Sequence, residues 1–321
     1  MEQRKCGGLK MSEIGLGTAT WGATTGRDDA RDQLKEFAAA GGSLVDTADF
    51  YGQGRSEEMI GDLLGRVVQR SDVVLASKAG VIRDGSLSMC CSAEHLLSAL
   101  DTSLRRLRTD HLDLWQLHGW DPGVQLEETL QAVDVALNSG RVRHAGVCNY
   151  TGWQTAKAAY RQQAFGHGPL VSTQVEYSLL QRGIEREVVP AARDANMGIL
   201  AWAALGRGVL TGKYQDGVPK HLWGSSFFRR YVSGYVNDHC NRIVSAVALC
   251  AQELDVSPLA VALSWVRAQP GVAAAVIGAR TTDQLRESLT PRWVELRLPP
   301  DVMDHLDEVS RPCTGYPESG I

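Results

Sequence analysis

Four side chains in this sequence have types and spacing suited to acid–base chemistry. Asp46, Lys78 and His118 each stand at the end of a short apolar segment, and Tyr51 follows Asp46 by five residues. In barrel enzymes the catalytic groups lie at the carboxyl ends of the strands. If the three segments are neighbouring strands of one barrel, these four side chains meet at one face of it.

The combination predicts a tyrosine that acts as a proton donor. A free phenol has a pKa of about 10 and is a slow acid at neutral pH. A lysine ammonium nearby favours the phenolate and lowers that pKa, and an aspartate paired with the lysine holds the ammonium in place. A neutral histidine can add a hydrogen bond to a carbonyl oxygen. Such a tyrosine can protonate that oxygen while hydride reaches the carbon.

Each of the four residues also has a purely structural interpretation. Asp46 can cap the turn that follows it, His118 can be a satisfied interior histidine, and Tyr51 can be a packing residue. Lys78 is harder to explain in this way, because a lysine after an apolar strand is rarely buried without a partner. The functional interpretation therefore depends on the four residues occurring together.

The elements that must position these residues alternate between strand and helix. The segments between the apolar β-branched stretches have helical periodicity, and Ser92, Gly140 and Ser257 are the expected helix caps. Such alternation indicates parallel strands joined by crossovers, so we expect a closed (β/α)8 barrel, with a doubly wound open sheet as the alternative. The eight expected strands are Ile14–Thr18, Ser43–Thr47, Val73–Ser77, Leu112–Leu117, Arg143–Cys148, Val171–Val175, Gly198–Trp202 and Ala274–Gly278.

Two segments depart from this repeat. Arg4–Cys6 and Leu9–Met11 flank a Gly-Gly pair and predict a hairpin that caps the barrel floor. The long segment Asp216–Cys240, between the seventh and eighth strands, is rich in aromatic residues. A long connection at this position is either a lid or an additional helix packed on the barrel. No Pro- or Gly-rich linker divides the chain, so we expect residues 1–321 to form one domain.

Composition excludes several classes of protein. The 321 residues carry a net charge of −4, which provides no basic field for nucleic acid or anionic lipid. No apolar run is long enough for a membrane helix, and the first ten residues do not resemble a signal peptide, so we expect a soluble cytoplasmic protein. The seven cysteines have no C-x-x-C spacing and predict free thiols. The eight histidines are scattered without H-x-H, so a metal-dependent hydrolase lacks a ligand set and no metal site is expected.

Seven blocks of the sequence resemble the signature blocks of the aldo-keto reductases. In chain order they are GLGTATWG, VDTADFYGQGRSEEMIG, ASKAG, DLWQLHGWD, GVCNY, TQVEYSLL and AWAALGRGVLTGKY. A further segment, GARTTDQLRES, resembles the motif that holds the adenosine end of the coenzyme. The ordered set extends from Gly15 to about Ser288. It is most similar to the branch of bacterial reductases and potassium-channel β-subunit-like proteins.

The resemblance implies roles for individual residues. Asp46, Tyr51, Lys78 and His118 match the catalytic tetrad of the family, with Tyr51 as the proton donor. Asn149 and Gln174 match the residues that hold the nicotinamide carboxamide, and Trp202 matches an aromatic residue that stacks on its ring. The implied coenzyme-binding set is Thr18, Asp46, Cys148, Asn149, Gln174, Trp202, Ala203, Leu205, Gly206, Gly208, Lys213, Gly278, Arg280, Gln284, Glu287 and Ser288.

The implied coenzyme is NADP(H) rather than NAD(H). Arg280 suits a 2′-phosphate because a guanidinium is planar and always charged, and Lys213 adds charge near the phosphates. Three positions differ from the usual family pattern. Cys148 replaces a serine, Ala203-Ala204 replaces Ser-Pro, and Ser288 replaces an asparagine. We therefore expect coenzyme contacts that are weaker or differently shared.

The sequence predicts an NADPH-dependent reductase of an aldehyde, a ketone or a keto-sugar. Trp21, Tyr51, His118 and Trp120 are expected to line the substrate pocket, and Phe227 belongs to the aromatic segment expected to cover it. Aromatic walls suit apolar, aromatic and sugar-like substrates equally, so the substrate stays open. The oligomeric state is also open. The alternative function is a redox-sensing subunit that binds NADP(H) with negligible turnover.

Overall fold

The computed structural model describes residues 1–84, 86–215, 217–290, 294–313 and 315. Eight parallel strands form a closed barrel in the order β3, β4, β5, β8, β9, β10, β11 and β12, and β12 pairs with β3 to close it. This confirms the (β/α)8 prediction and excludes the open sheet. The barrel strands are β3 (Ile14–Gly17), β4 (Leu44–Asp46), β5 (Val74–Ala79), β8 (Leu112–Leu117), β9 (Val142–Cys148), β10 (Leu170–Glu176), β11 (Gly198–Trp202) and β12 (Val272–Gly278).

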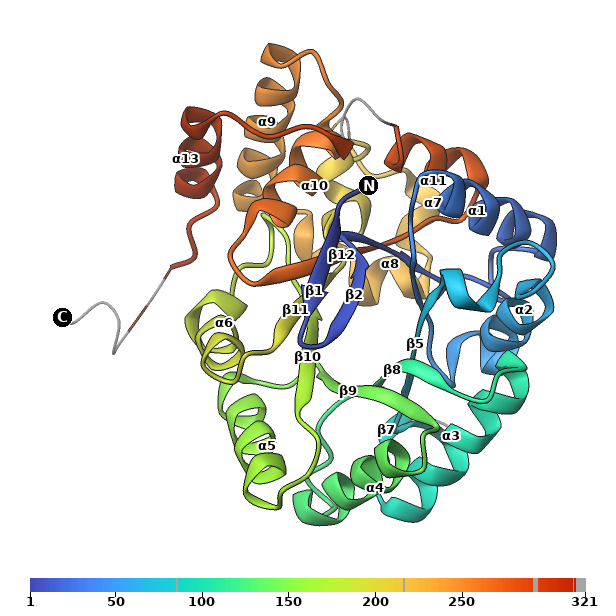
Figure 1. Cartoon of the computed structure of the whole chain (residues 1–321). Coiled ribbons are helices and arrows are strands. Elements are labelled where there is room, and N and C mark those ends of the chain that lie inside the picture. Colours follow the sequence, from blue (N-terminus) through green and yellow to red (C-terminus); the bar gives the residue numbers. More distant parts are fainter. Residues whose placement is uncertain (85, 216, 291–293, 314, 316–321) are drawn as a thin grey trace.

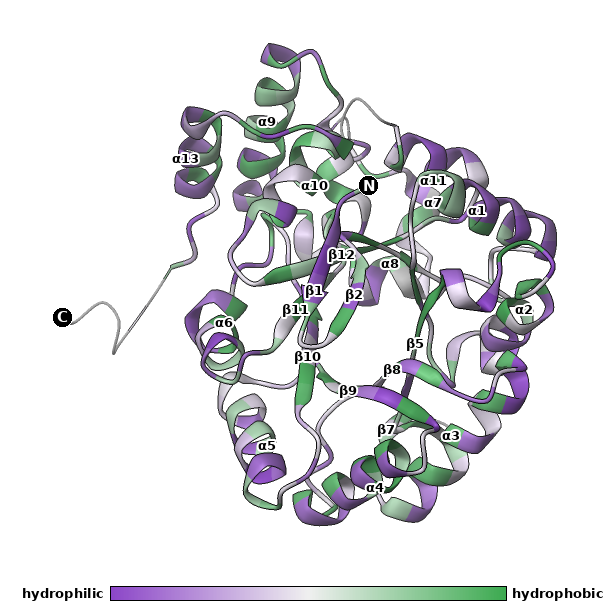
Figure 2. Cartoon of the chain, viewed as in Figure 1, coloured by the Kyte–Doolittle hydropathy of each residue, from purple (hydrophilic) through white to green (hydrophobic). Residues whose placement is uncertain are grey.

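Helices surround the strands (Figure 1). In Figure 2, hydrophilic residues are concentrated on these outer helices, as expected for helices that bury one side against the sheet. The helices are α1 (Arg27–Ala39), α2 (Arg55–Leu63), α3 (Ala93–Leu107), α4 (Leu126–Asn138), α5 (Gly152–Ala164), α6 (Ile184–Asp194), α9 (Asp238–Glu253), α10 (Pro258–Ala268), α11 (Thr282–Ser288) and α13 (Pro300–Val309). Short 3-10 turns are η1 (Tyr51–Gly54), η2 (Arg70–Asp72) and η3 (Gly206–Thr211).

The expected helix boundaries are present. The Ser92 hydroxyl accepts a hydrogen bond from the backbone N–H of His95 at the start of α3, and the Ser257 hydroxyl accepts one from Ala260 at the start of α10. Gly140 follows the end of α4 with a φ of +75°, a backbone conformation that favours glycine. These caps satisfy backbone groups that a helix end leaves unpaired.

The predicted floor hairpin is formed by β1 (Gln3–Cys6) and β2 (Leu9–Ser12), which pair antiparallel. Its buried side chains Cys6, Leu9 and Met11 belong to the same apolar cluster as Leu44 and Leu114 of the barrel strands. The hairpin therefore covers the interior at the end opposite the strand carboxyl ends. All seven cysteines are free, and five of them are buried.

A second hairpin was not predicted. It consists of β6 (Val81–Asp84) and β7 (Ser86–Met89), inserted between β5 and α3. The segment is short and largely polar, so its apolar alternation is weak. The dipeptide Asp84-Gly85 was the signal in the sequence that could have indicated a hairpin.

The long connection after β11 carries helices of its own, as one of the two expectations stated. Within it lie α7 (Lys220–Trp223), α8 (Ser226–Tyr231) and η4 (Ser233–Tyr235), and α9 begins at Asp238. Phe228 is buried between the rings of Tyr214 and Trp223, at centroid distances of 5.8 and 5.1 Å. Asp216 lies outside the described residues.

Among the described helices, none is by itself long and apolar enough to cross a membrane. The pair α9 and α10, bent by 102° at the break between them, passes the same criteria of length and composition when taken together.

Candidate active site

The barrel brings Asp46, Tyr51, Lys78 and His118 together. Asp46 is the last residue of β4, Lys78 lies near the end of β5, and His118 directly follows β8. These three strands are neighbours in the barrel. Tyr51 is the first residue of η1, in the loop that leaves β4. The predicted grouping at the strand carboxyl ends therefore occurs in the structure.

Lys78 is the buried centre of this group. Its Nζ donates to Oδ1 and Oδ2 of Asp46 at 2.8 and 2.7 Å and to the backbone oxygen of Thr47 at 2.7 Å. Burial disfavours the ammonium, but Asp46 and the neighbouring Tyr51 favour it more strongly, so the pKa of Lys78 is raised. A permanent positive charge is thus held at the strand ends with all three of its donors in use.

Tyr51 lies next to this charge. The Lys78 Nζ is 5.3 Å from the centroid of the phenol ring, and the ring meets the His118 imidazole edge-on at 6.0 Å. Burial raises the pKa of Tyr51 to about 12, and Lys78 lowers it only in part. The expected direction of the Lys78 effect is present, but the expected net lowering is wrong because desolvation of the phenolate is the larger contribution. Tyr51 is therefore fully protonated at neutral pH.

His118 is held as a neutral imidazole. Burial, and then the charge of Lys78, lower its pKa to about 3. The side chain is 8% exposed, and its Nδ1 is buried without a hydrogen-bond partner among the described residues. Its backbone N–H donates to the oxygen of Ala79 at 2.9 Å, which fixes the loop after β8. A buried nitrogen without a partner is costly, so this is a position where a ligand group can form a hydrogen bond.

A network behind Tyr51 fixes the turn that carries it. Nη1 of Arg106 donates to the backbone oxygen of Asp49 at 3.0 Å and to Oε2 of Glu57 at 3.3 Å. The fully buried Glu57 also accepts from the Ser77 hydroxyl at 2.7 Å. Burial raises the pKa of Glu57, and its hydrogen bonds oppose that rise. Sequence reasoning missed this network, although an acidic residue on the apolar side of a helix was a signal for it.

Asp49 is a second carboxyl group close to Tyr51. Its Oδ1 is buried without a partner among the described residues. Burial, followed by the charge of Glu57, raises the pKa of Asp49 to about 7. Its backbone N–H donates to the oxygen of Lys78 at 3.0 Å, so the turn of Tyr51 is tied directly to β5.

Three of the residues expected at the nicotinamide are joined by hydrogen bonds to the catalytic group. Asn149 Nδ2 donates to the backbone oxygen of His118 at 3.1 Å. Gln174 Nε2 donates to Oδ1 of Asp46 at 2.9 Å and its Oε1 accepts from the Cys148 thiol at 3.7 Å. Burial raises the pKa of Cys148 to about 12, so it remains a thiol and can act as a weak donor where a serine is usual.

Trp202 is oriented by groups on two sides. Its Nε1 donates to Oδ1 of Asn149 at 3.1 Å. The guanidinium carbon of Arg207 lies 5.0 Å from the centroid of the indole ring, and Arg207 itself forms two hydrogen bonds with Glu176, at 3.0 and 2.8 Å. Arg207 covers one surface of the indole, which leaves the other for a stacking ligand. Sequence analysis did not identify Arg207 or Glu176.

The segment after β11 bends through left-handed conformations. Ala203, Gly206 and Gly208 have φ values of +53°, +55° and +85°. Leu205 is half-buried between them. The Lys213 ammonium lies against Gly208, where a Cβ would be only 2.4 Å from Nζ. The positive φ of Gly208 favours glycine, and the absence of a side chain there lets the lysine ammonium lie against the backbone.

Lys213 and Arg280 bring two positive charges together. Burial, and then the charge of Arg280, lower the pKa of Lys213. Neither side chain forms an ion pair with a carboxylate among the described residues. Two cations that repel each other and have no paired anion form a site where phosphate oxygens would be favourable.

The residues expected around adenosine lie at the end of β12 and on α11. Gly278 is the last residue of β12, and the exposed Arg280 donates its backbone N–H to Oε1 of Gln284 at 3.0 Å. Glu287 is exposed. Ser288 is buried, and its hydroxyl donates to the backbone oxygen of Gln284 at 3.0 Å. The hydroxyl of Ser288 is therefore directed into the helix and not toward solvent.

Two predicted site residues are interior residues in the structure. Thr18 is fully buried, where its hydroxyl donates to the backbone oxygen of Asp46 and accepts from Ser56. Trp21 is also fully buried, and its indole donates to Gln33 at 2.9 Å. Neither side chain offers surface to a ligand. Trp120, two residues after His118, is half-buried. The Phe227 side chain lies outside the described part of the structure.

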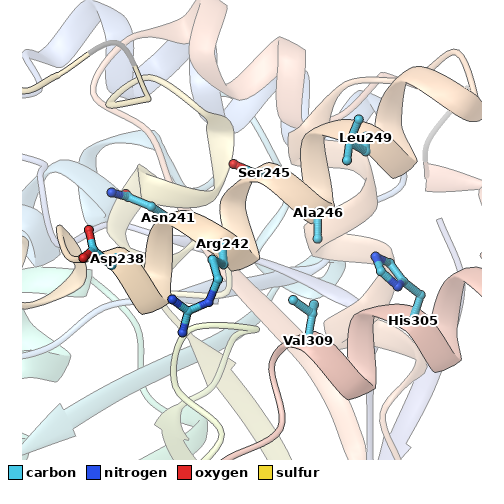
Figure 3. Close-up of a pocket in the computed structure, with 8 residues that line it drawn as sticks. All are labelled: Asp238, Asn241, Arg242, Ser245, Ala246, Leu249, His305 and Val309. Carbon is cyan, nitrogen blue, oxygen red and sulfur yellow. The ribbon is translucent and has the colours of Figure 1, made fainter.

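A groove elsewhere on the described part of the molecule is separate from this site. A groove of about 610 Å³ lies between α9 and α13 and is lined by residues such as Arg242, Leu249 and His305 (Figure 3). It contains none of the residues described above. Within the described ranges, no three His, Cys, Asp or Glu side chains are grouped so as to hold a metal ion.

Comparison with known proteins gives one consistent result. The profile of the Aldo/keto reductase family matches residues 13–311. The chain is 33% identical to the uncharacterized oxidoreductase YrpG of Bacillus subtilis, over 94% of this chain and 93% of the relative. It is 32% identical to the aldo-keto reductase YhdN of the same organism, over 87% and 84%. It is 28% identical to a probable voltage-gated potassium channel subunit beta of Arabidopsis thaliana, over 97% of both chains.

Proposed function

The chain belongs to the aldo/keto reductase family, and on that basis we propose that it reduces an aldehyde, a ketone or a keto-sugar to the alcohol with NADPH. The observation that carries the proposal is the position of Tyr51. The protonated phenol lies between the ammonium of Lys78, fixed by Asp46, and the neutral imidazole of His118. This arrangement suits proton donation to a carbonyl oxygen.

The residues present fit a nicotinamide coenzyme. Arg207 lies over the indole ring of Trp202, and the ammonium of Lys213 lies against Gly208. Lys213 and Arg280 are neighbouring cations that have no carboxylate partner among the described residues. Asn149 provides an amide group bonded to Trp202, and Gln174 provides one bonded to Asp46. When bound, the reduced nicotinamide supplies hydride to the carbonyl carbon. The exposed Arg280 favours the 2′-phosphate of NADP over NAD.

The chain's own groups would perform the proton transfer. His118, uncharged because of its low pKa, donates a hydrogen bond to the carbonyl oxygen and orients it. Tyr51 then gives its proton to the same oxygen, so the carbonyl gains one hydride and one proton. The phenolate that remains is stabilised by the Lys78 ammonium, which Asp46 holds in place, and it recovers a proton from solvent.

The variant Tyr51→Phe tests this proposal. It removes the proton donor but keeps the ring, so we expect the steady-state rate of NADPH oxidation on a panel of aldehydes to fall by at least about 100-fold. NADPH binding, measured by the change in coenzyme fluorescence, should stay close to that of the unmodified protein. A variant that retains full turnover on the panel would refute the assignment of Tyr51.

The similarity to a potassium channel β subunit supports a second candidate function. In that case the chain binds NADPH and signals its redox state to a partner with negligible turnover. Single-turnover oxidation of bound NADPH by an aldehyde, compared with the steady-state rate, separates the two. A fast single turnover followed by very slow cycling favours the sensing role, and equal fast rates favour the reductase.

A further inference from the structure

An aromatic cluster stands beside the catalytic strand ends and is not used by the proposed mechanism. Trp120 meets Tyr150 and Trp153 in edge-on contacts, each with a centroid distance of 5.3 Å. Tyr150 is 2% exposed, Trp120 is half-buried, and Trp153 is 56% exposed. The cluster therefore passes from the protein interior to solvent, and its outermost indole is held in place by its neighbours.

The cluster is directly connected to the catalytic group. Trp120 is two residues from His118 in the loop after β8, and Trp153 is the second residue of α5, just after Asn149. The hydrogen bond from Asn149 to the backbone oxygen of His118 joins the two loops. Figure 1 shows α5 on the side of the barrel away from α7 and α11, which adjoin the expected coenzyme segments. This is the side of the barrel on which we place the remote end of a substrate held at Tyr51.

A cation accompanies the exposed indole. Lys157 lies four residues after Trp153, so both side chains project from the same side of α5. Its Nζ is 5.9 Å from the centroid of the Trp120 ring. Within the described residues Lys157 has no carboxylate partner. The carboxylate of Asp121, close in sequence to Trp120, accepts from the backbone N–H groups of Gly123 in its own loop and of Cys91 in the loop before α3.

We propose that Trp153 and Lys157 form an outer substrate subsite that selects carbonyl compounds whose remote end is an aromatic ring bearing a carboxylate. This inference rests on the proposed reductase function and names the substrate class. The exposed indole gives a planar surface for an aromatic ring, and the ammonium pairs with the anion at its edge. A neutral sugar would stack on the indole but would form no ion pair with Lys157. An alkyl chain would form no ion pair and would stack less well.

Three substrates with the same reacting end separate these contributions. They are 4′-formylbiphenyl-4-carboxylate, biphenyl-4-carbaldehyde and 4-cyclohexylbenzaldehyde, which differ only in the outer ring. We expect kcat/KM to decrease in that order for the unmodified protein. Trp153→Ala should lower kcat/KM about tenfold for the two biphenyl substrates, through KM, and leave the cyclohexyl compound within about twofold. Lys157→Met should lower it about threefold to fivefold for the carboxylate alone, an effect that added salt removes.

Matched variants on the same helix serve as controls. Phe165→Ala removes an exposed aromatic side chain next to the far end of α5, and Arg161→Met removes a neighbouring cation. Both should leave the substrate order unchanged. Trp153→Phe should retain most of the preference for the biphenyl substrates, because it keeps an aromatic surface. If Trp153→Ala and Lys157→Met preserve the substrate ratios as the controls do, the subsite assignment is wrong.

A binding measurement separates failure of the subsite from failure of the reductase function. Biphenyl-4-carboxylate has no reducible carbonyl, and its binding to the NADPH complex can be followed by calorimetry. Absence of turnover on all three aldehydes, together with binding that Trp153→Ala and Lys157→Met weaken, would refute the reductase and retain the subsite. Absence of binding that depends on these two residues would refute the subsite, whatever the turnover.

Discussion

At the scale of single residues, the site depends on charges that are buried and fully paired. Lys78 lies in the interior, yet it keeps its charge because Asp46 accepts two hydrogen bonds and Thr47 accepts a third. A buried ion pair contributes little net stability when intact, but removing one partner leaves an uncompensated charge. Tyr51 and His118 next to this pair are both uncharged at neutral pH. The Lys78 ammonium, held in place by Asp46, is therefore the positive charge that can stabilise a phenolate formed during turnover.

Asp46→Ala tests this dependence. Because Lys78 would lose the carboxylate that pairs with it, we expect the free energy of unfolding to fall by about 3–5 kcal/mol. Urea unfolding followed by circular dichroism measures it. Asp62→Ala is the control, since Asp62 pairs with the exposed arginines Arg27 and Arg108 at the surface and should cost less than about 1 kcal/mol. Equal losses of stability in the two variants would show that the buried pair with Lys78 contributes no more than a surface ion pair.

At the scale of elements, separate helices and strands hold the catalytic loop. The turn of Tyr51 contains left-handed backbone at Gly52 and Gln53, so it needs support from outside. That support comes from Arg106 near the end of α3, which binds the backbone of Asp49 and the buried Glu57 of α2. The Ser77 hydroxyl of β5 donates a further hydrogen bond to Glu57. Two helices and a strand therefore converge on the residue expected to donate the proton.

Arg106→Met tests whether this support positions Tyr51. It leaves Glu57 buried without its cation, so we expect the protein to lose about 2–4 kcal/mol of stability. In the folded variant, kcat on an aldehyde should fall about tenfold while the KM for NADPH stays within about twofold, because Arg106 contacts Asp49 and Glu57, which are not among the expected coenzyme-binding residues. Arg105→Met is the matched control, since Arg105 is exposed and bonds only within α3. A fall in stability without a change in kcat would assign Arg106 a purely structural role.

At the scale of the whole molecule, the closed barrel controls protonation by excluding water. His118 directly follows barrel strand β8 and is buried, and burial together with the charge of Lys78 lowers its pKa to about 3. In the unfolded chain the same side chain has a pKa of about 6.5. Between these values the unfolded chain binds a proton at this residue and the folded protein does not. Acid therefore favours unfolding, and the stability linked to His118 is lost as the pH falls below 6.5.

His118→Gln removes this linkage. Between pH 7 and pH 5 we expect the unmodified protein to lose about 2 kcal/mol more of its unfolding free energy than the variant does. Urea unfolding at the two pH values, without coenzyme, provides the comparison. His305→Gln, at an exposed position on α13, should follow the unmodified protein. Parallel losses in the unmodified protein and His118→Gln would show that His118 is not buried in its neutral form.

Local patterns in the sequence were sufficient for much of the fold. All eight barrel strands, the floor hairpin and the capping residues Ser92 and Ser257 lie where the sequence predicted them. Apolar periodicity and caps are properties of neighbouring residues, so they can be read without the fold. The β6–β7 hairpin was missed because its few residues carry only a weak pattern.

The sequence by itself also determined which residue types reach the catalytic face, because the carboxyl ends of neighbouring strands must meet. Only the tertiary structure decided what surrounds them. It showed that burial outweighs Lys78 at Tyr51, that Trp21 and Thr18 are interior residues, and that the exposed Trp153 packs against Trp120. The reason is physical. Strand order follows from local patterns, whereas desolvation and contacts such as Arg106 with Glu57 arise between residues far apart in the chain.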